Sequence, residues 1–230
     1  MVRPGGGRHW FVKSKALVTF GPDERYVVGV STDITERKLA ENQSLTARRR
    51  LEVLNELSTA IIAGAQRDYL TQYAVDSLAR LLPGLRAVYS VVDEHFRQSG
   101  IVEKGRDRRM SGPPLDADLR QYPEYLEALC RGELVLIEDS QKPGRWPAFR
   151  NRIRSEGIRA VIDVPIRRQG KLQALLSVDS VAPVDWESDN VQTITEVADA
   201  LAVALEYDAT RKEREEAESA LRQGKAFLDG

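Results

Sequence analysis

The chain has 230 residues, enough for one domain of ordinary size together with additional segments. Its formal net charge of −1 creates no field that would favour nucleic acid or an anionic membrane as a partner, while its 30% of charged residues indicates exposed helices. No apolar run approaches the roughly 20 residues of a membrane-spanning helix, and the N-terminus lacks the apolar core of a signal peptide, so the sequence predicts a cytoplasmic protein.

The first part of the chain alternates like two strands. Residues 10–32 place apolar side chains at every second position, with a turn signal at Gly21-Pro22-Asp23. Two strands of this length cannot bury a core alone, so they either pair with something outside the sequence or end a domain that begins before it. Asp33 and Glu36 then have the spacing of a capping box, which predicts a helix that continues to about residue 65.

That helix is polar at first and then carries a narrow apolar stripe. Leu51, Leu54, Leu57 and Ile61 recur at steps of three and four residues. Such a stripe on a polar helix is typical of a two-stranded coiled coil, and a solvated linker helix is the alternative. Beyond a break at Gly64, the sequence predicts further helices at about 68–82, 116–131 and 145–156. It also predicts strands at 87–92, 98–103 and 133–138, and its composition predicts a loop at 104–114.

The clearest pattern is a hairpin from Ala160 to Val178 that turns at Gln169-Gly170. One face of the hairpin is strongly apolar, and the other is mixed and includes Asp163 and Ser177. The apolar face requires helices to cover it. A helix that starts near residue 188 provides an apolar stripe, so the sequence predicts an α+β fold with a central antiparallel sheet and helices packed on one face.

Two segments resemble known families. The residues Tyr26-Val-Val-Gly-Val-Ser-Thr-Asp-Ile-Thr-Glu-Arg-Lys38 resemble the end of a PAS domain, in which the last strand leads through an Asp-Ile-Thr-like triad into a signalling helix. The resemblance implies that residues 1–35 are the C-terminal end of a PAS domain and that residues 36–52 form a signalling-helix linker.

Residues 53–207 resemble a GAF domain. The resemblance rests on Gly157-Ile-Arg-Ala-Val-Ile-Asp-Val-Pro-Ile166, the turn before Lys171, Ala174-Leu-Leu-Ser-Val-Asp-Ser180 and the closing helix through Leu205. It implies an antiparallel sheet with the terminal helices on one face and a ligand cavity on the other. Residues 208–230 would be a coiled-coil linker to a further module of a bacterial multidomain sensor, with a histidine kinase or diguanylate cyclase as the effector outside this chain.

Few residues are suited to catalysis. His9 and His95 are the only histidines, and neither lies in a sequence typical of a phosphoacceptor. Cys130 is the only cysteine, so it can form no internal disulfide and no zinc cluster. Some GAF domains attach a bilin through a cysteine, but Cys130 lies late in a helix with no histidine beside it, and it is interpreted as a small buried apolar residue. No catalytic residue or metal site is predicted, and no cofactor is identified.

The candidate ligand cavity lies on the mixed face of the hairpin. Asp163, Ser177 and Tyr89 are expected to face it, with Trp146 and Phe149 as a wall or lid. The alternative is that both large aromatic residues belong to the core and that Asp163 is salt-bridged or exposed. The layout predicts a homodimeric sensor that pairs through its N- and C-terminal helices and binds a small molecule. A relay scaffold without a ligand and a small enzyme that uses Cys130 are the alternatives.

Overall fold

The computed structural model describes residues 9–19, 25–105 and 116–228. Two compact units make up the chain, residues 1–49 and residues 50–230, and each is described by itself. The predicted turn at Gly21-Pro22-Asp23 and most of the predicted loop at 104–114 lie outside the described residues.

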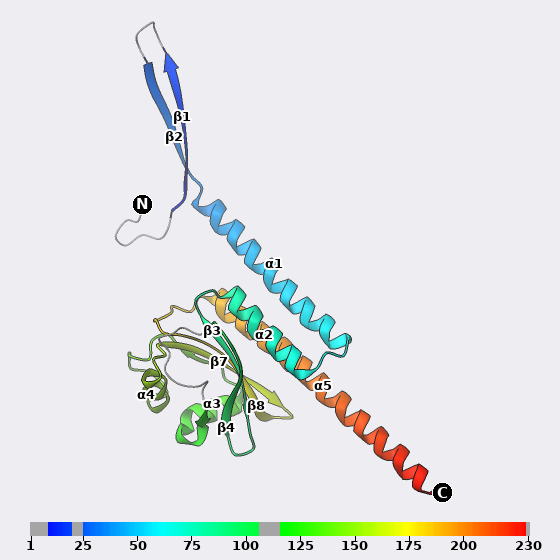
Figure 1. Ribbon diagram of the computed structural model, residues 1–230. Helices are drawn as coiled ribbons and strands as arrows, with labels where there is room; N and C mark the ends of the chain where they lie inside the picture. The colour runs from blue at the N-terminus through cyan, green and yellow to red at the C-terminus, as the bar shows by residue number, and fades with distance from the viewer. Residues whose placement is uncertain (1–8, 20–24, 106–115, 229–230) are drawn as a thin grey trace. The chain divides into compact units, whose positions relative to one another are not determined.

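The first unit is a β-hairpin followed by the start of a helix (Figure 1). Strand β1 (Phe11–Thr19) pairs antiparallel with β2 (Arg25–Asp33), and helix α1 (Thr35–Ile62) follows directly. The Asp33 carboxylate accepts hydrogen bonds from the Thr35 backbone N–H at 2.8 Å and from the Thr35 hydroxyl at 2.5 Å. These bonds satisfy a donor at the helix start, which explains why strand β2 gives way to a helix at this point.

The second unit contains a six-stranded antiparallel sheet in the order β5-β4-β3-β8-β7-β6. After the end of α1, its elements are α2 (Arg67–Leu81), β3 (Arg86–Val92), β4 (Arg97–Lys104), β5 (Ala117–Asp118), the 3-10 helix η1 (Leu119–Gln121), α3 (Pro123–Arg131), β6 (Val135–Ile137), α4 (Pro147–Ser155), β7 (Ala160–Arg168), β8 (Lys171–Ser180) and α5 (Ser188–Leu228). The predicted α+β fold with an antiparallel sheet is confirmed.

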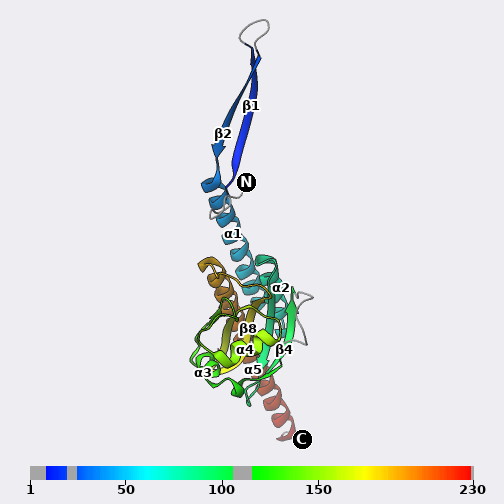
Figure 2. The same cartoon turned by 90° about the vertical axis from the view of Figure 1, so that its left-hand side faces the viewer.

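Helices cover both faces of this sheet. Helices α2 and α5 lie on one face, while α3 and α4 lie on the other and point toward the viewer in Figure 2. The helix-side core, between the sheet and α1, α2 and α5, includes Leu57, Leu78, Ile162, Leu176 and Leu201. The expectation that the terminal helices pack on one face is therefore confirmed. A second core fills the opposite side and includes Leu119, Leu129, Ile137, Ile153 and Leu175.

The region predicted as one helix at 116–131 is divided into three elements. Strand β5 and the 3-10 helix η1 come first, and α3 begins only at Pro123. The Asp118 carboxylate accepts the Arg120 backbone N–H at 3.1 Å, which starts the 3-10 turn. Pro123 is compatible with the first turn of a helix but removes a donor further inside it, so the helix starts there.

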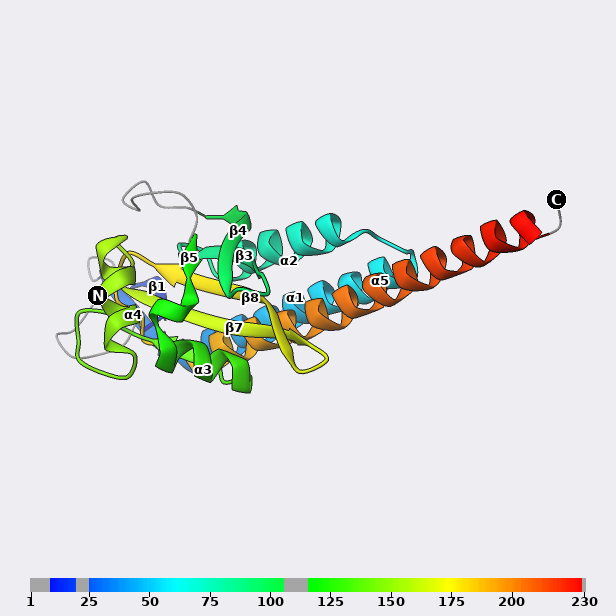
Figure 3. The ribbon, with the colours of Figure 1, turned by 90° about the horizontal axis from the view of Figure 1, so that it is seen from below.

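Helix α5 is one continuous element of 41 residues that extends well past the strands (Figure 3). Its first half is buried against the sheet, and its residues from Lys212 to Arg222 are exposed. The predicted domain boundary at residues 207–208 lies inside this helix. Between the two parts, the buried Asp208 carboxylate pairs with Arg211 and Lys212, each at 2.9 Å.

Candidate functional site

The candidate site is built around Asp163, which β7 places on the α3/α4 side of the sheet. Asp163 lies opposite Ser177 in the β7–β8 register. The Ser177 hydroxyl donates to Oδ1 of Asp163 at 2.5 Å, and the Tyr125 hydroxyl of α3 donates to Oδ2 at 2.8 Å. Asp163 is only 2% exposed. The structure therefore brings two of the sequence-predicted residues together and adds Tyr125, which the sequence analysis did not identify.

Burial dominates the electrostatics of this cluster. Removal from water raises the pKa of Asp163, although the hydrogen bonds from Ser177 and Tyr125 and the charge of Arg152 oppose the change. Burial and the neighbouring Asp163 also raise the pKa of the Tyr125 hydroxyl well above its usual range. The cluster therefore favours a protonated tyrosine beside a carboxyl group whose neutral form is stabilised.

Aromatic side chains from α3 and α4 pack over Asp163. The Phe149 ring is stacked on Tyr125 with ring centroids 3.7 Å apart, and Tyr122 meets Phe149 edge-on at 5.8 Å. Trp146 is buried in the same core, and the Arg145 guanidinium lies 4.5 Å from the centre of its ring. Both predicted aromatic residues thus lie on the same side of the sheet as Asp163.

A small pocket opens between the first turns of α3 and α4. Its volume is about 130 Å³, and its lining comprises Tyr122, Pro123, Glu124, Tyr125, Trp146, Pro147, Ala148 and Phe149. Most of this lining is apolar, and the exposed Glu124 is its one charged residue. Trp146 and Phe149 both line this pocket, whereas Asp163 and Ser177 do not and are linked to it through Tyr125.

The placement of Tyr89 in this cavity is wrong. Tyr89 lies opposite Leu176 in the β3–β8 register and belongs to the core beneath α2 and α5. Its hydroxyl accepts a hydrogen bond from the Arg67 guanidinium of α2 at 3.4 Å. Strand β3 is buried on both faces, so its sequence shows no apolar alternation that would have indicated where Tyr89 points.

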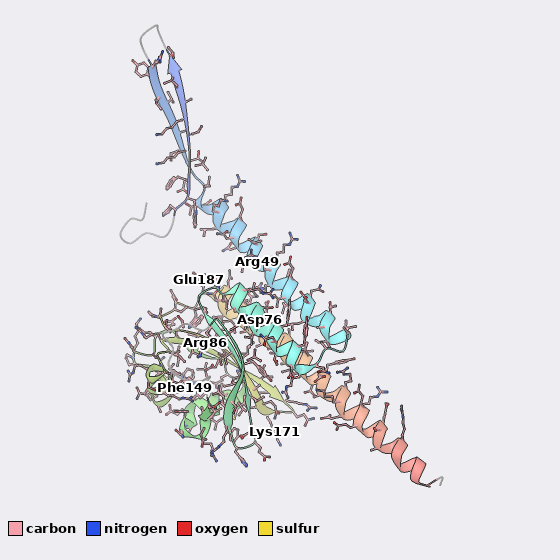
Figure 4. The ribbon with its side chains drawn as sticks, in the orientation of Figure 1. Arg49, Asp76, Arg86, Phe149, Lys171 and Glu187 are labelled. Atoms are coloured by element: carbon pink, nitrogen blue, oxygen red, sulfur yellow. The ribbon has the colours of Figure 1, made fainter. Side chains whose placement is uncertain are left out.

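Further polar residues share the α3/α4 side of the sheet. The Arg86 guanidinium forms a bidentate salt bridge with Asp179, with contacts of 3.0 and 2.6 Å, and both residues are buried. The Gln98 amide donates to the Ser90 hydroxyl at 2.9 Å. Figure 4 labels Arg86 on β3 and Phe149 on α4. A sheet face with this many buried polar groups differs from an ordinary apolar core.

Arg152 on α4 completes the site. Its Nε donates to Glu156 at 2.9 Å, and its Nη2 donates to the Asp116 carbonyl at 3.1 Å. Its Nη1 is buried and has no hydrogen-bond partner among the residues that the structure describes. Arg152 follows Phe149 by three residues, so both side chains project from the same face of α4.

The remaining candidates of the sequence lie elsewhere. Cys130, interpreted from the sequence as a small buried apolar residue, is only partly buried at the last turn of α3, where it packs against the second core. His9 and His95 are exposed. In the described parts of the chain, no three His, Cys, Asp or Glu side chains are grouped so that they could hold a metal ion. None of the helices in the described parts is both long enough and apolar enough to cross a membrane.

Comparison with known proteins agrees with this architecture. The phycoerythrobilin-bound GAF domain of a cyanobacterial phytochrome has 16% identity and a TM-score of 0.63, with 70% of this chain and 96% of that chain covered. The GAF domain of an Acinetobacter phosphoenolpyruvate-protein phosphotransferase has 17% identity and a TM-score of 0.53, with 70% of this chain and 94% of that chain covered. At these identities the likeness shows the fold alone.

Curated proteins gave no match. The model of the GAF domain family matches residues 66–205, which span α2 to the middle of α5 and contain every residue of the Asp163 cluster. The match does not extend to residues 1–35, so their assignment to a PAS domain stays a prediction. The chain belongs to the GAF domain family.

Proposed function

We propose that this chain is the regulatory sensor module of a signal-transduction protein, with a small-ligand site between the sheet and helices α3 and α4. The observation that carries the proposal is that strand β7 contacts both the candidate site and the exit helix. Asp163 lies in the site, and Arg168, five residues later on the same strand, is bonded to α5. A displacement of β7 would therefore reach α5 directly.

The contact with α5 is well suited to this role. Arg168 Nε lies 2.8 Å from Glu206, and its Nη2 lies 2.8 Å from Glu213. The two glutamates are seven residues apart, so they lie on one side of the helix two turns from each other. One side chain thus contacts α5 at two positions, so a movement of β7 would change the ion pairs at both. A ligand would change the output only if it bound the two arrangements of α5 with different affinity.

The same proposal includes a homodimer. On α5, Val203 and Tyr207 are 65% and 53% exposed on the side away from the core, and Leu51 of α1 is 63% exposed. Apolar side chains at such helix positions favour pairing with a second copy. The helices would then carry the signal to an effector outside this chain, for which a histidine kinase or diguanylate cyclase is our proposal.

A relay scaffold without a ligand is the second candidate. It is favoured by the stacked Tyr125 and Phe149, which fill much of the space above Asp163 and are nearly inaccessible to solvent. In this case the unit would transmit a change between α1 and α5 and sense nothing by itself. Both candidates require the dimer, and they differ in the content of the cavity.

Native mass spectrometry of the purified chain, followed by denaturing mass spectrometry, tests the proposal. A dimer with an adduct that is lost on denaturation supports the ligand-binding sensor, whereas a dimer of bare chains supports the scaffold. A monomer at high concentration contradicts both. Val203→Asp should shift the mass to the monomer, and Tyr69→Asp, at a similarly exposed position of α2, should leave it unchanged.

A further inference from the structure

The guanidinium of Arg152 contains a buried donor with no acceptor. The Arg152 side chain is only 12% exposed. Its Nε and Nη2 have partners, but Nη1 has none among the described residues. A buried N–H group that lacks an acceptor costs free energy comparable to a lost hydrogen bond, and more when it is charged. Such a group is therefore expected to have a partner in the working state of the protein.

Among the described residues, no nearby carboxylate accepts a hydrogen bond from this donor. Glu156 already accepts from Nε, and both oxygens of Asp163 accept from Ser177 and Tyr125. Nη1 is therefore free to accept an additional partner, such as a bound ligand. Because the donor is cationic, it favours an anionic acceptor, and planar carboxylates fit the guanidinium geometry best.

The aromatic pocket and the Arg152 side chain meet at Tyr122. Tyr122 forms part of the pocket wall, and the Arg152 guanidinium lies 5.8 Å from the centre of the Tyr122 ring. The pocket volume of about 130 Å³ is similar to that of an apolar cavity of roughly 150 Å³ that holds one benzene molecule. Tyr125 and Phe149, which are stacked on each other, also line the pocket, and aromatic rings favour packing against a further ring.

We infer that the ligand class of this site is a small aromatic carboxylate, with its single ring in the pocket of α3 and α4 and its carboxylate on Nη1 of Arg152. This inference rests on the proposed ligand-binding function. The exposed Glu124 lines the same pocket, and its negative charge disfavours a carboxylate beside it, so the carboxylate is assigned to the Arg152 side. Binding would also bridge α3 and α4 over Asp163, and so stiffen the face of the sheet that β7 forms.

Isothermal titration calorimetry of the full chain with benzoate and phenylacetate tests the inference. Benzyl alcohol provides the ring without the charge, and acetate provides the charge without the ring. The two aromatic acids should bind at least about tenfold more tightly than either control, since a hydrogen bond to a charged group contributes this much. Equal binding of phenylacetate and benzyl alcohol would overturn the inference.

Substitutions test the contribution of the Arg152 guanidinium and that of the apolar pocket separately. Arg152→Gln should weaken phenylacetate binding by about tenfold or more and leave benzyl alcohol unchanged. Arg154→Gln is the matched control, because exposed Arg154 bonds only to Asn151 of its own helix in the described structure. Ala148→Leu should weaken both ring compounds by filling the pocket. Unchanged phenylacetate binding in Arg152→Gln would overturn the inference, and a thermal melt of that variant would show that it is folded.

The ligand class and the proposed function fail in different ways. If native mass spectrometry of the chain shows an adduct that phenylacetate does not displace, the ligand class is wrong while the sensor function stands. If neither an adduct nor binding of any aromatic acid is found, both are wrong. Displacement of the adduct by phenylacetate supports both.

Discussion

Asp163 and Asp139 are buried carboxyl groups in opposite electrostatic environments. Asp163 accepts hydrogen bonds from two neutral hydroxyl groups, and its burial raises its pKa. Asp139 instead forms a bidentate pair with the Arg159 guanidinium at 2.8 and 2.7 Å. This pair, together with the Gln141 backbone N–H, lowers the pKa of Asp139 to about 2. The two residues therefore contribute to stability over opposite ranges of pH.

For Asp163 we expect a contribution to stability that is lost as the pH rises. The neutral form is favoured in the folded protein, so the contribution is fully present below the ordinary pKa of 3.8 and disappears as the pH rises through the raised value. The difference in unfolding free energy between wild type and Asp163→Asn should thus shrink with increasing pH, as measured by urea titration. A difference that grows with pH would show that the folded protein prefers the ionised carboxylate.

Loss of the Asp163 acceptor should also be costly at any pH. Asp163→Ala leaves the Tyr125 and Ser177 hydroxyl groups without their acceptor in a site that water does not reach, which should cost about 1–3 kcal/mol for each group left unpaired. Tyr125→Phe removes one of these donors together with its hydrogen bond, so it should cost less. Equilibrium unfolding in urea compares the two variants, and equal losses would contradict the hydrogen-bond argument.

For Asp139 the pH dependence of the contribution to stability is the opposite. The ionised form is favoured in the folded protein, so its contribution is present above pH 3.8 and is lost as the pH falls through about 2. Asp139→Asn should therefore lower the melting temperature at neutral pH and have a much smaller effect near pH 2. Thermal melts of both proteins across this range provide the measurement, and a constant difference at every pH would contradict the assignment.

Among the elements, the β7–β8 hairpin was the most predictable from sequence. Its strands alternate strictly over a face that the helices cover, and Gln169-Gly170 supplies the two positive φ angles, 49° and 80°, that a two-residue turn of this kind requires. The position of Asp163 and Ser177 on one face follows from that alternation. The alternation thus predicted both strands of the hairpin and the two residues, Asp163 and Ser177, that these strands contribute to the site.

The other half of the site could not be derived in this way. Tyr125 and Arg152 are separated from their partners Asp163 and Asp116 by 38 and 36 residues. Only the packing of α3 and α4 on the sheet brings them together, and no local periodicity encodes that packing. The apolar side of α3 indicates that Tyr125 is buried but not which carboxyl group receives its hydroxyl.

The contact between β7 and α5 provides a test of the relay at the level of elements. Arg168→Gln removes both ion pairs with Glu206 and Glu213, so the amide hydrogens of α5 after residue 206 should exchange faster. The unfolding free energy should fall by less than about 1 kcal/mol, because partly exposed ion pairs contribute little. Arg214→Gln, which breaks a pair with Glu218 within the exposed helix, is the control and should leave exchange before residue 210 unchanged.

At the scale of the whole molecule, the second unit holds its own cores. Both clusters of buried apolar residues begin at or after Val53, and the described residues of the first unit, 9–19 and 25–49, contribute no member. Removal of residues 1–49 should therefore leave the melting temperature of the remaining chain within a few degrees of the full chain, since a loss of 1 kcal/mol corresponds to about 2–4 °C for 150–250 residues. A cooperative transition that is lost on truncation would show that the two units fold together.

The three tryptophans of the chain lie in three different parts of the structure, so the fluorescence of each can report on its own surroundings. Trp10 adjoins the hairpin of the first unit, where its backbone N–H donates to the Thr35 hydroxyl. Trp146 lines the aromatic pocket, and Trp186 is anchored beside the edge of the sheet by its indole N–H on the Ile137 carbonyl. Intrinsic fluorescence of variants that keep one indole at a time would therefore follow the hairpin, the pocket and the sheet edge independently, with no added label.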